Sequence, residues 1–159
     1  MIKLISKKNF YLFVTILSIV TLVGAVYIEY ILNAKPCKLC LYQRYPYIAA
    51  IFVSFFGYYK YNNKFILYFL TFIFFISLII SGYHVGIEKS FFLDFSGCVS
   101  ENTNTLVKED LLNNLSEIPN NCKDVYFTIL GLSLATINAL MSLLIVIISV
   151  LLITYEKNR

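Results

Sequence analysis

Charged side chains are scarce in this sequence. Aspartate, glutamate, lysine and arginine together make up 14% of the 159 residues, whereas hydrophobic residues make up 59%. An ordinary soluble domain carries about 25% charged residues. The sequence also lacks internal repeats and low-complexity linkers. We therefore interpret residues 1–159 as one small membrane domain.

Nearly every charge lies outside four long apolar runs, at residues 10–32, 41–59, 65–83 and 126–155. A helix needs about 20 apolar residues to cross the hydrocarbon core of a bilayer. Irregular backbone cannot face lipid, because its amide groups would be left unpaired. The sequence therefore predicts an all-α membrane protein, a bundle of four transmembrane helices.

The first apolar run follows Lys3, Lys7 and Lys8, as the apolar part of a cleaved signal peptide would. The run is, however, longer than a typical signal-peptide core, and no clear small-x-small cleavage site ends it. The segment that follows it holds two of the cysteines. We therefore predict an uncleaved first span.

Lysine and arginine near the span ends predict which ends lie in the cytoplasm. Six such residues lie in two outer loops, at about 33–44 and 84–125, together with seven acidic residues. The termini and the middle turn carry the other seven in very short segments: Lys3, Lys7, Lys8, Lys60, Lys64, Lys157 and Arg159. Both termini are therefore predicted to be cytoplasmic. The net charge of +4 reflects this asymmetry and does not indicate a nucleic-acid partner.

Cysteine is absent from the predicted spans and from the cytoplasmic segments. All four cysteines, Cys37, Cys40, Cys98 and Cys122, lie in the two outer loops. The exported side of a membrane is the oxidising side, so an even number of cysteines there predicts two disulfides. One interpretation is that both disulfides only stabilise the loops.

The spacing of Cys37 and Cys40 instead favours redox chemistry at this pair. Two cysteines separated by two residues exchange readily between dithiol and disulfide. A thiolate near a helix start and near Lys38 and Arg44 should have a lowered pKa. A ring this small adds little stability, because the gain from closing a loop rises with loop length.

Two metal-centred interpretations fit the cysteines less well. Covalent haem attachment needs a histidine directly after the second cysteine of the pair, where this sequence has Leu41. Structural zinc sites normally use two closely spaced pairs, whereas Cys98 and Cys122 are 24 positions apart. We therefore predict no metal site.

The run PCKLCLYQR at residues 36–44 resembles the signature of the DsbB family, bacterial inner-membrane proteins that reoxidise the periplasmic disulfide donor DsbA. The run YHVGIE at residues 83–88 is also similar, as are the long loop with a cysteine near each end and the segment from Cys122 through Leu130-Gly131-Leu132 that enters the last span. The resemblance covers nearly the whole chain. It implies a multi-pass protein of the bacterial inner membrane whose cysteine loops are periplasmic.

The resemblance also implies a quinone, either ubiquinone or menaquinone, bound beside the first cysteine pair. Electrons would pass from a reduced DsbA-like partner with a thioredoxin fold to the Cys98–Cys122 disulfide, then to Cys37–Cys40, and then to quinone. The implied partners are this donor, quinone and membrane lipid. The implied activity is that of a protein-dithiol:quinone oxidoreductase.

Two further residues are candidates for the quinone site. Arg44 follows Cys40 by four positions, so the two lie on the same face of a continuous helix. Arg44 could stabilise a thiolate and a quinone oxyanion, although interfacial arginines commonly reach toward lipid headgroups. His84, the only histidine, could donate a hydrogen bond to quinone.

Other polar and aromatic residues near the span ends have simpler interpretations. Glu29, an acid within a span, is predicted to be structural, through snorkelling or through pairing with Lys35 or Arg44. Tyrosines near the span ends are typical of an interface belt. Among them, Tyr42 and Tyr45 could also line a quinone pocket.

The long second loop contains one predicted helix. Residues 105–118 place leucines at helical spacing opposite polar side chains, which predicts an amphipathic helix. It lies either in the membrane interface or against other loop residues.

The sequence alone leaves two other functions as alternatives. The first is an enzyme similar to vitamin K epoxide reductase, in which we would expect the short cysteine pair late in the chain. The second is a non-catalytic membrane scaffold with structural disulfides.

Overall fold

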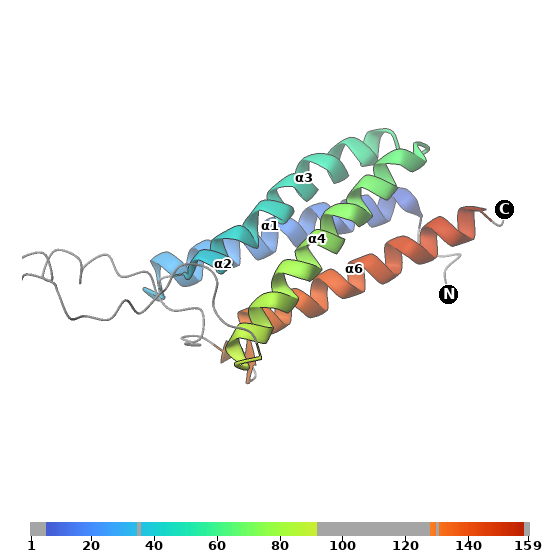
Figure 1. Cartoon of the computed structure of the whole chain (residues 1–159). Coiled ribbons are helices and arrows are strands. Elements are labelled where there is room, and N and C mark those ends of the chain that lie inside the picture. The colour runs from blue at the N-terminus through green and yellow to red at the C-terminus, as the bar shows by residue number, and fades with distance from the viewer. Residues whose placement is uncertain (1–5, 35, 92–127, 130, 158–159) are drawn as a thin grey trace, which may run out of the picture.

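The computed structural model describes residues 6–34, 36–91, 128–129 and 131–157. The helices are α1 (Lys7–Tyr30), α2 (Lys38–Tyr42), α3 (Arg44–Tyr59), α4 (Lys64–Glu88) and α6 (Leu134–Lys157), and the strands are β1 (Thr128–Ile129) and β2 (Leu132–Ser133). Among the described residues, the long helices α1, α3, α4 and α6 run alternately in opposite directions, and α1 packs on α3, α3 on α4 and α4 on α6 (Figure 1).

The two ends of this bundle differ in what they carry. The start of α1, the turn between α3 and α4, and the end of α6 lie together at one end (Figure 1). The short helix α2, the end of α4 and the strands β1 and β2 lie at the other end. The first cysteine pair is therefore at the end opposite the start of α1 and the end of α6.

Three helices in the described part of the chain, α1, α4 and α6, are long and apolar enough to cross a membrane. The prediction of a helical membrane protein is confirmed to that extent. The second apolar run, predicted as a span at residues 41–59, is divided at Gln43 into α2 and α3. Since α3 has 16 residues, it is shorter than the roughly 20 that a span requires. The count of four spans stays a prediction.

The last helix begins later than the apolar run predicts, at Leu134 rather than at residue 126. The strands β1 and β2 pair in an antiparallel register, Thr128 opposite Ser133, around Gly131 at φ +79°. Glycine adopts this left-handed conformation without steric cost, so it permits the turn. Ser133 then caps α6, because its Oγ accepts a hydrogen bond from the Thr136 backbone N–H at 3.1 Å.

Helix α4 continues five residues beyond the predicted span end at residue 83 and ends at Glu88. We predicted the outer loop to begin at His84, but His84 lies within the helix. Both His84 and Ile87 are buried at the end of the bundle that carries the cysteine pair. Burial of this last turn against protein explains why the helix extends past the purely apolar run.

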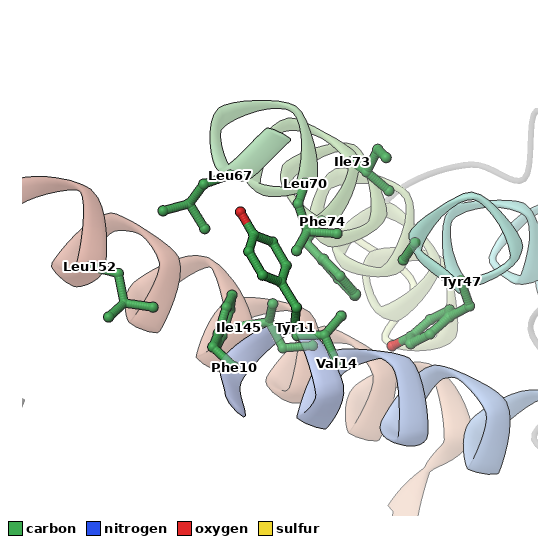
Figure 2. Packing of buried hydrophobic residues seen from close by; sticks show 11 residues of the cluster. Phe10, Tyr11, Val14, Tyr47, Leu67, Leu70, Ile73, Phe74, Ile145 and Leu152 are labelled. Carbon is green, nitrogen blue, oxygen red and sulfur yellow. The ribbon is translucent and has the colours of Figure 1, made fainter. Parts of the chain in front are cut away.

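The core lies along the length of the bundle, where α1 packs mainly on α3, and α4 packs on α6 and on α3. Figure 2 shows the ring of Tyr11 at the centre of this packing. A Cβ added at Gly57 of α3 would lie 2.6 Å from Cε1 of that ring, so glycine permits the close approach. The buried cluster consists of Phe10, Tyr11, Val14, Tyr47, Ala50, Leu67, Leu70, Ile73, Phe74, Ile145 and Leu152.

Small polar side chains join the helices within this apolar bundle. Thr15 of α1 and Ser54 of α3 share a hydrogen bond of 2.7 Å, and Ser77 of α4 and Ser142 of α6 share one of 3.0 Å. Such pairs are typical of helix packing in lipid, where small residues allow close approach. The outward faces of all four long helices carry large exposed apolar side chains, as expected for surfaces that contact lipid.

Candidate redox site at the first cysteine pair

The first cysteine pair lies at the start of α2. Cys37 is the N-cap residue of this helix, and its Sγ accepts a hydrogen bond of 3.4 Å from the Cys40 backbone N–H. The two sulfur atoms are 3.2 Å apart. Cys37 is buried at 6% exposure and packs with Leu39 against Ile87 of α4, whereas Cys40 is partly exposed. The fold therefore holds two adjacent thiols of unequal accessibility.

His84 from α4 lies directly against this pair. Its side chain is buried, with 3% of the residue exposed, and its Nε2 lies 3.6 Å from Cys37 Sγ. The same nitrogen lies 3.8 Å from Oε1 of Glu88, one turn further along α4. Glu88 Oε2 accepts a hydrogen bond of 2.5 Å from the Ser133 hydroxyl. Our sequence-based prediction placed His84 near quinone, and in the structure it contacts the cysteine sulfur.

Sequence reasoning missed a chain of polar side chains behind His84. Gln43, between α2 and α3, places its Nε2 at 2.9 Å from His84 Nδ1. Asn138 of α6 donates a hydrogen bond of 2.8 Å from its Nδ2 to Gln43 Oε1. The hydroxyl of Tyr47 donates to Asn138 Oδ1. The available signal was two amide side chains within the apolar runs 41–59 and 126–155, where an unpaired amide would be costly.

Arg44 forms an ion pair with Glu29 of α1, with 2.6 Å between Arg44 Nη1 and Glu29 Oε2. The side chains are 22% and 24% exposed, so water screens this pair only partly. Of the alternatives expected for Glu29, the structure shows the pairing with Arg44. Gln43 has helical dihedral angles, φ −67° and ψ −17°, and so continues the helical path from Cys40 to Arg44.

An apolar groove of about 580 Å³ lies beside the pair, between the α2–α3 segment and α4. Its walls include Leu39, Tyr42, Tyr45, Ile76, Ile80 and Tyr83. Leu39 and Tyr83 also belong to the cluster around Cys37. The volume is in the range of small-molecule sites, about 300–1,000 Å³. Tyr42 and Tyr45, which we expected either in an interface belt or in a pocket wall, line this groove.

The sulfur atoms of Cys37 and Cys40 and a ring nitrogen of His84 all lie within 4.8 Å of one another. Two thiolates and an imidazole are ligands that suit Zn²⁺ or Cu⁺. This three-residue group differs from the four-cysteine zinc site that the sequence disfavours. The other two predicted site residues, Cys98 and Cys122, and the predicted helix at residues 105–118 lie outside the described residues.

Comparison with known proteins decides the family. The family model named "Disulfide bond formation protein DsbB" matches residues 7–152, which is most of the chain. The chain belongs to the DsbB family. This DsbB match confirms the resemblance predicted from residues 36–44 and extends through all four long helices.

A curated relative of this DsbB family member is the uncharacterized protein RP370 of Rickettsia prowazekii (strain Madrid E). The two sequences are 28% identical over 147 residues, which cover 90% of this chain and 86% of the relative. DsbB membership identifies the chain as a membrane disulfide-formation protein and, at the level of the family, as a disulfide-generating oxidoreductase. Proteins of this family work with quinones and with a thiol–disulfide partner.

Proposed function

We propose that this protein reoxidises a periplasmic DsbA-like disulfide donor and passes the electrons to a membrane quinone. The observation that carries the proposal is the placement of Cys37 and Cys40, 3.2 Å apart, between a buried histidine and an apolar groove. A structural disulfide would need neither neighbour. The family match supports the redox class of this assignment.

The proposed reaction balances in electrons and protons. A donor dithiol becomes a disulfide and releases two electrons and two protons, which convert one quinone to one quinol. The partner thiolate attacks Cys98, and Cys122 leaves as a thiolate. Cys122 then attacks Cys37 and releases Cys40 as the leaving thiolate.

The donor's second thiolate attacks its own mixed disulfide, which completes the donor disulfide and frees Cys98. Cys98 then attacks Cys122, which restores the Cys98–Cys122 bond and releases Cys37. The reduced Cys37 and Cys40 would finally re-form their disulfide as two electrons and two protons pass to quinone.

The groove fits a quinone by chemistry and by position. Its lining is almost entirely apolar, which suits an isoprenoid chain, and it adjoins the cysteine cluster through Leu39 and Tyr83. Tyr45 and Ile79 of its rim are exposed on the outer surface of the bundle. A ligand dissolved in lipid can therefore enter from the side. A bound quinone would supply a two-electron acceptor beside the thiols.

We propose distinct roles for the two polar residues near the pair. Arg44 provides a fixed positive charge one helical turn beyond Cys40, which would stabilise negative charge on sulfur or on a quinone oxygen. Its pairing with Glu29 orients the guanidinium. His84 would act primarily on Cys37, whose sulfur it contacts, rather than directly on quinone.

We further propose the inner-membrane topology with four spans and both termini in the cytoplasm. The second span would run from Lys38 through Tyr59, a total of 22 residues in α2 and α3 joined at the helical Gln43. This length is sufficient for a bilayer crossing. The outward apolar side chains of α3, such as Phe52 and Phe56, support the assignment.

The function is tested with purified protein in lipid nanodiscs that contain a defined quinone. A reduced thioredoxin-fold donor is added, and donor thiols and quinone absorbance are followed together. We expect one quinone to be consumed per donor disulfide formed, and we expect Cys40→Ser to abolish both signals. Donor oxidation without loss of quinone under anaerobic conditions would contradict the proposal.

A further inference from the structure

The polar chain formed by Tyr47, Asn138 and Gln43 ends at one nitrogen of the His84 ring. We propose that Gln43 is a positioning residue that, together with Asn138 and Tyr47, holds His84 in the tautomer with its hydrogen on Nε2, directed at the sulfur of Cys37. The inference deepens the proposed function, on which its mechanistic meaning rests, but its test requires no turnover.

The orientation of each amide follows from its neighbours. Tyr47 donates its hydroxyl hydrogen to Asn138 Oδ1, so the amide nitrogen of Asn138 is turned the other way. That nitrogen donates to Gln43 Oε1 at 2.8 Å. The oxygen of Gln43 is thereby occupied, and its Nε2 is the atom that faces His84 Nδ1 at 2.9 Å.

The chemistry of the amide then selects the histidine tautomer. An amide NH₂ group can only donate hydrogen bonds, so Nδ1 of His84 must accept one with its lone pair. A neutral imidazole carries a single N–H, which is consequently on Nε2. Nε2 lies 3.6 Å from Cys37 Sγ, so its hydrogen is directed at that sulfur.

The carboxylate of Glu88 reinforces this assignment from the other side. Its Oε1 lies 3.8 Å from Nε2, where a negative charge favours a hydrogen on that nitrogen over a bare lone pair. The Ser133 hydroxyl holds the second carboxylate oxygen at 2.5 Å. The two sides of the imidazole ring therefore favour the same tautomer.

This tautomer of His84 would affect the sulfur of Cys37. Its sulfur faces two N–H donors, the Cys40 backbone at 3.4 Å and His84 Nε2 at 3.6 Å. Hydrogen bonds to the charged form stabilise a thiolate. Of the reduced pair, Cys37 is then the sulfur that holds negative charge and Cys40 is the one that keeps its proton. Re-forming the Cys37–Cys40 bond would release two electrons and that proton, and quinone would take them up together with one proton from solvent. His84 in this state is a hydrogen-bond donor and not a general base.

The single histidine of the chain makes a direct test possible. The full-length protein is produced with histidine labelled with an NMR-active nitrogen isotope, reduced, and examined at mildly alkaline pH, where an ordinary imidazole is neutral. We expect one pair of ring-nitrogen signals, with hydrogen on Nε2 and a bare Nδ1. A hydrogen on Nδ1 and a bare Nε2 would overturn the proposal, because the amides would then be reversed.

The variant Gln43→Glu tests the role of the amide while keeping the shape of the side chain. A carboxylate only accepts, so Nδ1 should gain a hydrogen, whether the ring becomes the other tautomer or imidazolium. An unchanged, bare Nδ1 would refute control by Gln43. Ser54→Ala is the matched control, because it removes an interhelical hydrogen bond of α3 elsewhere, and the signals of His84 should not change.

The direction of the Nε2 hydrogen is tested with the two cysteines. Removing the sulfur in Cys37→Ala should shift the Nε2-bound proton resonance clearly, whereas Cys40→Ala should shift it much less. An equal or larger shift in Cys40→Ala would overturn the assignment of Cys37 as acceptor. A protein without quinone activity would still show the proposed tautomer, so failure of the proposed function and failure of this inference are distinguishable.

Discussion

Glu29 and Arg44 are joined by a 2.6 Å ion pair that links α1 to the start of α3, one helical turn beyond Cys40. We predict that Arg44→Ala leaves the protein folded but raises the quinone KM roughly tenfold, which corresponds to ~1.4 kcal/mol. This loss of apparent quinone affinity is the size expected when one charge-assisted contact is removed. The measurement is steady-state kinetics at varied quinone content.

The variant Glu29→Gln separates the two roles of the arginine. It removes the negative charge of the pair, but the side-chain amide oxygen can still accept a hydrogen bond from the guanidinium and keep it oriented, so the quinone KM should change little. An equal rise in KM for both variants would reduce Arg44 to a structural partner of Glu29.

The apolar groove yields a second prediction. Ala49 lines it on the α3 side, so Ala49→Phe should fill part of its volume. We expect a higher quinone KM with an unchanged KM for the reduced donor. The neighbouring Ile48→Phe is the control, because Ile48 is exposed on the same helix and is not part of the groove lining. Equal effects of both variants would argue against quinone in this groove.

Close packing at Gly57 yields a stability prediction. In Gly57→Ala the new methyl group would meet the Tyr11 ring at 2.6 Å, and overpacking of this kind costs about 1–3 kcal/mol. The expected result is a lower midpoint of unfolding in micelles. Gly82→Ala is the matched helical control, since nothing lies within 4 Å of its added Cβ, and it should be neutral or stabilising. A Gly57→Ala protein as stable as the control would show that the ring moves aside freely.

Thiol labelling tests the proposed sidedness. After reduction, Cys37, Cys40, Cys98 and Cys122 should all react with a membrane-impermeant reagent from the periplasmic side. Cys37 should react more slowly than Cys40, because it is the more buried of the pair. Labelling of Cys37 from the cytoplasmic side alone would refute the predicted orientation.

The order of electron transfer is testable by trapping. Each mixed disulfide needs a resolving thiol for its release. Cys122→Ser should therefore leave a donor that lacks its own resolving cysteine covalently bound to Cys98. Non-reducing electrophoresis and mass spectrometry would locate the bond. A complex formed only through Cys37 or Cys40 would contradict the proposed order.

Hydropathy predicted the positions of the long helices but not the details at the site end. The first span was expected at residues 10–32, and the structure has helix α1 over Lys7–Tyr30. The two ranges are close because the sequence there is one long apolar stretch of the length that a helix needs to cross lipid. The delayed start of α6 was missed because the residues around Gly131 are apolar but adopt a turn. Hydropathy alone does not distinguish an apolar helix from an apolar hairpin.

The candidate site was predictable only where its residues are close in sequence. The two-residue spacing of Cys37 and Cys40 indicated thiol chemistry directly. The contact of His84 with Cys37 spans 47 positions, and that of Asn138 with Gln43 spans 95. Such pairs depend on the packing of α4 and α6 against the α2–α3 segment. The expectation that the protein binds a quinone came from the family resemblance and not from the pattern of residues.

The outward opening of the groove determines how its ligand concentration must be counted. Tyr45 and Ile79, which line the groove, are exposed on the surface that lipid would cover, so a quinone bound there would arrive by diffusion within the plane of the bilayer. The relevant quantity is the number of ligand molecules per lipid, and the volume of buffer does not enter. Doubling the lipid at a fixed amount of quinone halves the concentration that the protein experiences, even when the sample volume is unchanged.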